Sequence, residues 1–136
     1  MIKALTVKPA AGPAAPAPVA DVKIVLNDYN FDFSTPVTAG SHTFEVHNGA
    51  KQPHEIEILK LAPGKTVKDL NAWMAKMDGP PPASAIGGTL PTAGGAPAYF
   101  TADFTPGDYV FLCFIPDMKD GKPHFVHGMI TTVTIK

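Results

Sequence analysis

Short runs of alternating apolar and polar residues, separated by glycine, proline and asparagine, make up most of the chain from Asp21 onward. Val22, Ile24 and Leu26 share one parity, and the segments 42–46 and 55–58 repeat the pattern. Because the side chains of a strand point alternately to its two faces, each run predicts a half-buried strand. This feature restricts the chain to an all-β fold, and we expect a Greek-key sandwich of two packed sheets.

The last third of the chain predicts two further strands. Residues 109–115 are apolar on both parities, as expected of a central strand that is covered on both sides. Residues 129–135 return to alternation, with Met129, Thr131, Val133 and Ile135 on one face. These two strands, joined by a connecting loop, bring both ends of that loop to one pole of the sandwich.

One helix is expected between the two β-rich halves, over about residues 66–77. Thr66 and Asp69 are spaced like an N-cap and its partner. The apolar residues that follow at helical spacing are predicted to form its buried stripe, and they are Val67, Leu70, Trp73, Met74 and Met77. The segment after it, with three prolines at 80–82 and many glycines over 87–97, is predicted to be one long loop.

Length and charge restrict the function. The 136 residues suffice for one domain, expected over residues 21–136, without disulfides. A net charge of −1 argues against nucleic-acid binding, and no apolar run approaches the roughly 18 residues of a membrane span. Residues 1–20 are rich in alanine and proline, so we expect a flexible tether ahead of the domain, as is common in exported bacterial proteins.

Cys113 is the single cysteine, and it lies in a cluster of residues that can bind a metal. Cys113, His124, His127 and Met129 fall within 17 residues, where one strand ends and the next begins. Thiolate, imidazole and thioether together suit copper, and two histidines and one cysteine with a weak axial methionine form an electron-transfer site. His54, which follows Pro53 at the start of a strand, supplies the second histidine. His42 and His47 are interpreted as polar surface residues.

Several segments together resemble the cupredoxins. Gly40 to Gly49 followed by Pro53-His54 is similar to the strand, turn and first histidine ligand of that family, and residues 106–113 are similar to the strand that delivers the cysteine. His124, four further residues and Met129 are similar to the end of plastocyanins and of the type 1 site of copper nitrite reductases. The resemblance implies one mononuclear copper bound by His54, Cys113, His124 and Met129.

The chain departs from the small electron carriers of the family in three respects. Ten residues, 114–123, separate the cysteine from the next histidine, which is nearer to the nitrite reductase pattern. Glu55 follows the first histidine in place of the usual asparagine, which in the family ties the two ligand loops together by hydrogen bonds. Whether the ligand loops are tied together here is therefore open, and a carboxylate lies near the metal. His127 and Met118 are spare ligand candidates, so the ligand register also stays open at this stage.

Other features exclude related functions. No histidine adjoins Cys113, whose neighbours are Leu112 and Phe114, so the path that couples a type 1 copper to a catalytic copper is missing. A dinuclear centre bridged by two cysteines is ruled out by the single thiol, and cysteine nucleophile chemistry is disfavoured because no helix begins at Cys113. We therefore expect a non-enzymatic one-electron carrier, with a copper-delivery protein or a metal-free interaction module as alternatives.

The resemblance also implies how such a carrier would meet its partners. The edge of the His124 ring is expected to reach the surface inside an apolar patch framed by Pro123 and Phe125, where redox proteins would dock briefly. The protein is expected to be a monomer that acts in the periplasm or outside the cell.

Overall fold

The computed structural model describes residues 4, 6, 12, 13 and 15–136. Its elements, in chain order, are β1 (Val22–Asn27), β2 (Asn30–Phe33), β3 (Gly40–Asn48), β4 (Glu57–Leu61), α1 (Val67–Met74), β5 (Ala83–Gly88), β6 (Ala98–Phe104), β7 (Gly107–Leu112), the 3₁₀ helix η1 (His124–His127) and β8 (Ile130–Ile135). The tether expected over residues 1–20 falls partly outside the described residues and stays a prediction. Within the described part of the chain, no helix is long and apolar enough to cross a membrane.

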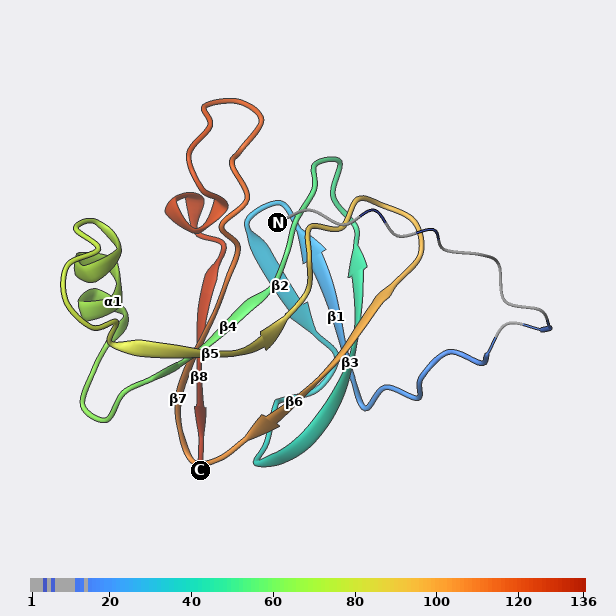
Figure 1. The fold of residues 1–136 in the computed structure, drawn as a ribbon, viewed down its shortest axis with the longest axis horizontal. Coiled ribbons are helices and arrows are strands. Elements are labelled where there is room, and N and C mark those ends of the chain that lie inside the picture. The colour runs from blue at the N-terminus through green and yellow to red at the C-terminus, as the bar shows by residue number, and fades with distance from the viewer. Residues whose placement is uncertain (1–3, 5, 7–11, 14) are drawn as a thin grey trace.

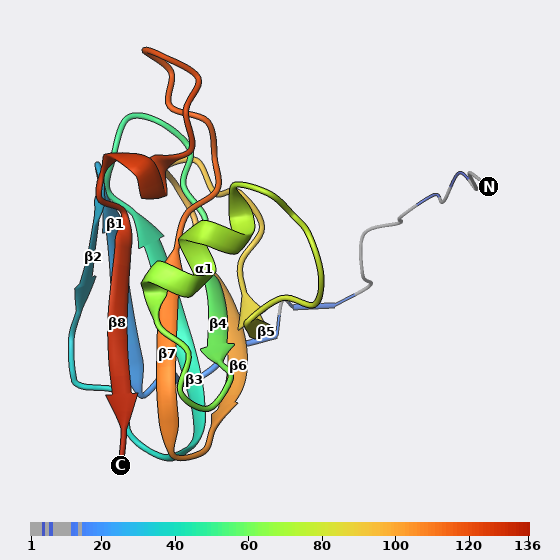
Figure 2. The same cartoon turned by 90° about the vertical axis from the view of Figure 1, so that its left-hand side faces the viewer.

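Two four-stranded sheets pack face to face. Their strand orders are β2-β1-β3-β6 and β5-β4-β7-β8, and the chain passes from one sheet to the other after β3, β5 and β6. The β1 and β3 pair is parallel and the other described pairs are antiparallel. Figures 1 and 2 show α1 beside the second sheet, with η1 at the end of the sandwich opposite the C-terminus. The predicted all-β sandwich with one inserted helix is confirmed.

Apolar side chains on the inward faces of the strands fill the space between the two sheets. In β1, Val22, Ile24 and Leu26 are buried while Lys23 and Val25 are exposed, as predicted. Phe44 and Val46 of β3 belong to the same buried cluster. These apolar faces supply most of the folding free energy, at about 1.5 to 3 kcal/mol for each fully buried large side chain.

Strand β7 is buried on both faces, as its sequence predicts. Tyr109, Phe111 and Cys113 point into the core between the sheets. Val110 and Leu112 point the other way and pack in a second cluster with Leu61 and Leu70, the latter from α1. Helix α1 therefore covers the outer face of β7, and the cysteine at the end of this strand is held by packing from two sides.

Helix α1 begins as predicted but ends earlier. The hydroxyl of Thr66 accepts the Asp69 backbone N–H and the Asp69 carboxylate accepts the Thr66 N–H, which forms the expected capping box. The helix stops at Met74, because the chain turns at Met77 (φ 51°) and Gly79 (φ 72°) before the three prolines. Met77 was wrongly assigned to the buried stripe, since it is 66% exposed.

The prediction of one long loop after the helix is wrong, because residues 83–88 form β5 at the edge of the second sheet. The strand lacks a run of large alternating side chains, and its register with β4 shifts between Ile58 and Leu59. Gly88 closes this irregular pairing at φ 154°, where an added Cβ would lie 1.9 Å from the Ile56 carbonyl oxygen. The glycines of this segment thus permit close backbone packing as well as turns.

Candidate metal centre

Four residues that the sequence singles out converge at the end of the sandwich that carries η1. His54 precedes β4 and is fixed by a bridge to Thr92, Cys113 follows β7 directly, His124 begins η1, and Met129 precedes β8. Each of the four side chains is fully buried. Three of the four positions therefore precede or follow a strand and are held by the sheets, while η1 holds His124.

The side-chain atoms of three of these residues face one another. Cys113 Sγ lies 3.4 Å from His124 Nδ1 and 3.9 Å from His54 Nδ1, and one ligand atom of each residue lies within 4.8 Å of those of the other two. The two imidazole rings are tilted by 49°, with centroids 4.4 Å apart. Ligand atoms bound to one ion at about 2.0 to 2.3 Å lie about 3.4 to 3.9 Å from one another, so a thiol and two Nδ1 atoms at this spacing can bind one metal ion.

Main-chain hydrogen bonds lock the cysteine, the second histidine and the methionine together. Cys113 N–H donates to the Met129 carbonyl (3.2 Å), and Met129 N–H donates to the His124 carbonyl (3.0 Å). The N–H of Phe125 donates to the Cys113 carbonyl at 3.0 Å. Gly128, at φ 104°, makes the left-handed turn that ends η1 and directs the chain back to Met129.

Glu55 links the two segments that carry His54 and Cys113. Its backbone N–H lies 3.5 Å from Cys113 Sγ, and its carboxylate accepts a hydrogen bond from the Phe114 N–H at 3.1 Å. The doubt that the sequence raised about this position is thereby resolved, because Glu55 provides a tie between the ligand segments. Burial raises the pKa of the Cys113 thiol, against a smaller lowering by backbone hydrogen bonds.

The outer nitrogen of each histidine faces a carboxylate. His54 Nε2 lies 3.1 Å from Asp28 Oδ1, a pairing that lowers the pKa of Asp28 through the hydrogen bond. A proton on Nε2 leaves the lone pair of Nδ1 free to bind a metal, and the carboxylate fixes that tautomer and the ring orientation. His124 Nε2 lies 3.7 Å from Asp117 Oδ2 and is the one buried side-chain polar atom without a hydrogen bond among the described residues.

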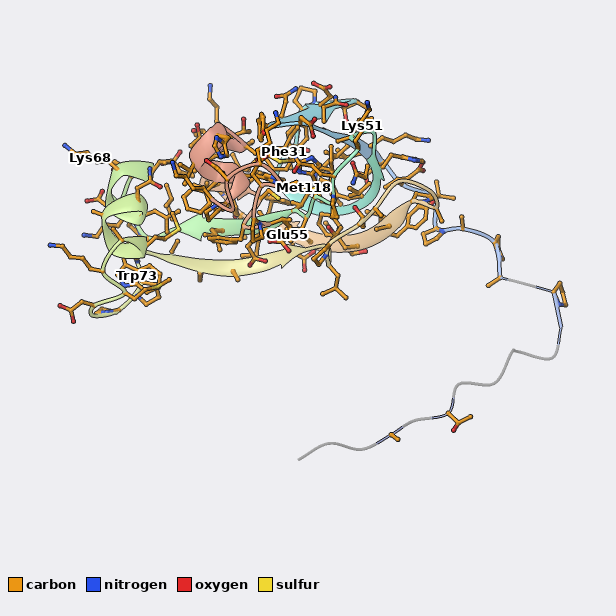
Figure 3. The ribbon with its side chains drawn as sticks, turned by 90° about the horizontal axis from the view of Figure 1, so that it is seen from above. Phe31, Lys51, Glu55, Lys68, Trp73 and Met118 are labelled. Carbon is orange, nitrogen blue, oxygen red and sulfur yellow. The ribbon has the colours of Figure 1, made fainter. Side chains whose placement is uncertain are left out.

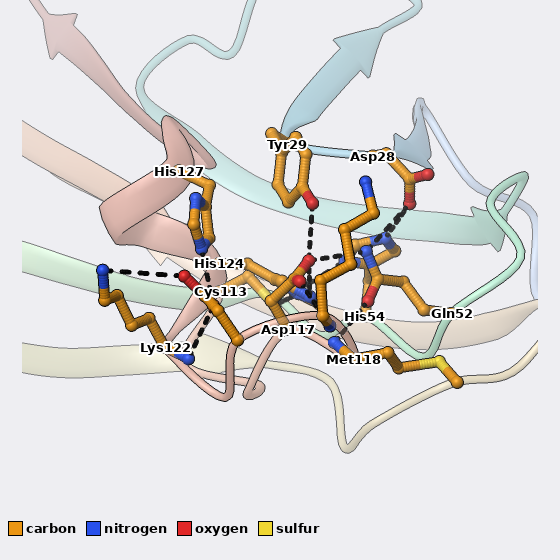
Figure 4. Close-up of polar contacts among 12 residues, drawn as sticks. Asp28, Tyr29, Gln52, His54, Cys113, Asp117, Met118, Lys122, His124 and His127 are labelled. Atoms are coloured by element: carbon orange, nitrogen blue, oxygen red, sulfur yellow. Dashed lines mark hydrogen bonds and ion pairs between the residues drawn. The ribbon is translucent and has the colours of Figure 1, made fainter.

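Asp117 is itself held in place by several donors (Figure 4). Its carboxylate accepts hydrogen bonds from the Tyr29 hydroxyl (2.5 Å), the Lys119 N–H (2.8 Å) and the Gln52 side-chain amide (3.1 Å). The Tyr29 hydroxyl and the Lys119 N–H hold the pKa of Asp117 far below its usual range. Gln52 also donates to Asp28 at 3.3 Å, so one amide connects the carboxylates behind both histidines.

These supporting residues were not predicted from the sequence. Asp28 and Tyr29 lie in the turn between β1 and β2, about 90 residues away from Asp117 along the chain. Aspartate, tyrosine and glutamine in turns are common in any soluble protein, so their residue types give no signal. Only the packing of the β1–β2 turn against the 114–123 loop brings them together.

The expectation that the His124 ring edge reaches the surface is wrong. The ring is fully buried, because Asp117 covers its outer nitrogen and Tyr29 packs edge-on against it at 5.8 Å between centroids. The long 114–123 loop, which supplies Asp117, thus covers the outer edge of the His124 ring. The two alternative ligand candidates lie outside the buried group. Met118 is 77% exposed, and His127 pairs with Asp120 at 3.1 Å.

The residues present fit a copper ion. One thiol and two imidazole nitrogens form a buried group, and the fully buried Met129 adjoins it through its main chain. Soft sulfur and borderline nitrogen donors in this combination favour copper over oxygen-seeking ions. His42 and His47 lie elsewhere, paired with Asp21 and Glu45. The His47 side chain is 42% exposed, as expected of a surface residue, whereas that of His42 is only 12% exposed and packs beside Phe44 and Phe104.

Three solved structures of the same fold each match 84 to 85% of the chain. The dithionite-reduced auracyanin of Roseiflexus castenholzii is 26% identical, with 84% of this chain and 94% of that chain covered and a TM-score of 0.56. Auracyanin A of Chloroflexus aurantiacus, described as a blue copper protein, is 21% identical over 85% and 98% of the two chains, with a TM-score of 0.52.

A third structure, rusticyanin from Thiobacillus ferrooxidans, is 18% identical over 84% of this chain and 76% of that chain, with a TM-score of 0.54. No protein-family model matches the chain, and no curated protein matches it. The chain therefore has the cupredoxin fold. The histidine, cysteine, histidine and methionine at the end of the sandwich fit a type 1 copper site.

Proposed function

We propose that the protein is a one-electron carrier that holds a single copper ion through His54, Cys113, His124 and Met129. The observation that carries the proposal is the buried group of one thiol and two imidazole Nδ1 atoms, 3.4 and 3.9 Å from the sulfur. A copper ion held by these residues would supply one-electron chemistry, because copper is stable both as Cu(II) and as Cu(I). The similarity to the auracyanins supports the same function.

The contribution of the protein is a ligand set that is already positioned. Asp28 orients His54, Glu55 ties the His54 and Cys113 segments, and main-chain bonds fix His124 and Met129. A site whose ligands cannot follow the different geometric preferences of the two oxidation states changes little on electron transfer, so reorganisation costs little. The same burial shields the thiol from oxidation.

Copper delivery is the less favoured alternative. A delivery protein must release its metal readily, which calls for exposed methionine and histidine ligands. Here the four candidate ligands are fully buried. The exposed Met118 and His127 lie outside the buried group, so they do not provide transient metal ligands beside it. We further propose that the protein is not an enzyme, and that it acts as an exported protein in the periplasm or outside the cell.

The proposal is tested by adding one equivalent of Cu(II) and following the visible spectrum through repeated reduction and oxidation. A carrier should show an intense thiolate-to-copper absorption that one electron equivalent bleaches and an oxidant restores, without loss of metal during gel filtration. A protein that binds copper without this band, or loses Cu(I) to a mild chelator in the first cycle, would support delivery instead.

A further inference from the structure

The burial of His124 raises the question of where a redox partner meets this protein. Among the described residues near the candidate centre, Phe114 is bonded directly to Cys113 and is 38% exposed, whereas the His124 ring is fully buried. Phe114 also packs edge-on against Phe125, with ring centroids 5.5 Å apart. The shortest covalent connection from the sulfur to an exposed aromatic side chain therefore leads toward α1.

Beside Phe114 lies a cavity of about 280 Å³ between α1 and the second sheet. We call it the α1 pocket, and the residues that matter for its chemistry are Glu57, Trp73, Met74, Met77, Pro81 and Phe114. Its volume is at the lower end for binding pockets, about 300 Å³, and suits one long side chain. The indole N–H of Trp73 donates to the Gly79 carbonyl at 3.0 Å, which fixes the ring at the pocket.

Glu57 is the one charged residue among those that line this apolar pocket. No described residue donates a hydrogen bond to the Glu57 carboxylate or forms an ion pair with it, and partial burial together with the nearby Glu55 raises its pKa. A carboxylate beside an indole and a phenyl ring is a good environment for a flat organic cation, because guanidinium and similar groups stack on aromatic faces while pairing with a carboxylate.

We infer that the α1 pocket is the docking site for a redox partner protein that inserts an arginine or lysine side chain from an apolar surface. This inference rests on the proposed electron-carrier function and assigns its contact surface to α1 and Phe114 in place of the His124 edge. Figure 3 shows Trp73 on α1, at one end of the molecule and well apart from Met118, which lies on the loop that covers the histidines. The two candidate surfaces can therefore be probed separately.

The first test maps contact without copper. The probe is the tris(phenanthroline)chromium(III) cation, which is positively charged, redox-inert and paramagnetic, so it broadens nearby amide signals of the full chain. The whole complex is larger than the α1 pocket and therefore reports cation contact at the mouth of the pocket. We expect the strongest broadening around Trp73, Met77 and Phe114, and weaker broadening in Glu57→Gln because one attractive charge is lost. Broadening centred on Met118 and Val126, or spread evenly over the surface, would overturn the assignment.

The second test uses tris(phenanthroline)cobalt(III), which has the same shape and charge, as a one-electron oxidant of the reduced copper protein. The cobalt(III) complex accepts the electron and becomes the cobalt(II) complex. Met77→Lys and Met118→Lys form a matched pair, since both methionines are exposed (66% and 77%) and each change adds one positive charge. Repulsion at contact should slow oxidation about tenfold in Met77→Lys and less than about twofold in Met118→Lys. The reverse order would place contact at the histidine side. Equal slowing would show that contact is not centred on the α1 pocket, and either result would overturn the assignment.

The two tests separate the inference from the proposed function. If copper gives no thiolate band, the electron-carrier proposal fails, while the chromium map still reports whether the α1 pocket binds cations. If the band forms and both tests point to the Met118 side, the electron carrier stands and the α1 docking site is wrong.

Discussion

Replacing Asp117 by asparagine should raise the reduction potential of the copper protein. The change removes one negative charge 3.7 Å from His124 Nε2 while it keeps the shape of the side chain and an oxygen that can accept from Tyr29. A negative charge near the metal stabilises Cu(II) more than Cu(I). Its removal therefore favours the reduced state.

The size of the effect follows from the geometry. A metal on the far nitrogen of the His124 ring lies about 2 Å beyond it, so the charge and the metal are on the order of 8 Å apart. Coulomb's law gives about 2 kcal/mol at an effective dielectric constant of about 20, and about 1 kcal/mol at about 40. Because about 59 mV corresponds to a tenfold change in a one-electron equilibrium, the expected rise is about 40 to 90 mV.

Spectroelectrochemical titration of the visible band measures this shift, and Asp120→Asn is the matched control. Asp120 lies on the same loop, pairs with His127 and is more exposed than Asp117, so solvent and salt should reduce its effect to below about 20 mV. A potential that falls in Asp117→Asn, or moves equally in both variants, would refute the reasoning that Asp117 acts on the centre through His124.

Three further predictions concern the ligand register and the scaffold. His124→Ala should abolish or strongly alter the copper absorption band, whereas His127→Ala should leave it largely intact, because His127 pairs with Asp120 outside the buried group; the opposite result would shift the register. Gly88→Ala should destabilise the fold by about 3 kcal/mol or more in urea unfolding, since its Cβ would clash with the Ile56 carbonyl, and a change below about 1 kcal/mol would contradict this packing. Asp117 has a pKa held far below the usual value of about 3.9, so the stability it adds is complete above that pH and is lost as the pH falls toward its folded-state pKa. Unfolding midpoints between pH 5 and pH 2 should therefore fall more steeply for the wild type than for Asp117→Asn, and parallel curves would argue against the Tyr29 and Lys119 contacts.

The parts of the fold that follow from local patterns were predictable. Alternation in β1, the continuous apolar run of β7 and the capping box of α1 each depend on residues close together in the chain. Strand β5 was missed because its small residues carry no alternation, and it forms where the edge of β4 offers unpaired main-chain groups. The end of α1 was misplaced because the left-handed turn at Met77 interrupts a continuing apolar spacing.

The candidate site was predictable to a similar degree. The types and spacing of Cys113, His124 and Met129 indicated a copper site, and the structure brings Cys113 and His124 together with the distant His54. Burial of His124 was not predictable, because it depends on the path of the 114–123 loop over the ring and on a hydrogen bond between Tyr29 and Asp117. Such contacts between turns leave no periodic signal in the sequence.

The proposed electron carrier depends on Cys113 as the thiolate ligand of a mononuclear copper centre. It is tested most directly by the visible spectrum of the wild type and of Cys113→Ser, each loaded with one equivalent of Cu(II), with circular dichroism to show that both are folded. We expect an intense blue or green band at one copper per chain in the wild type and no such band in folded Cys113→Ser. A folded variant that keeps the band, or a wild type that binds copper without it, would contradict the assignment of the centre.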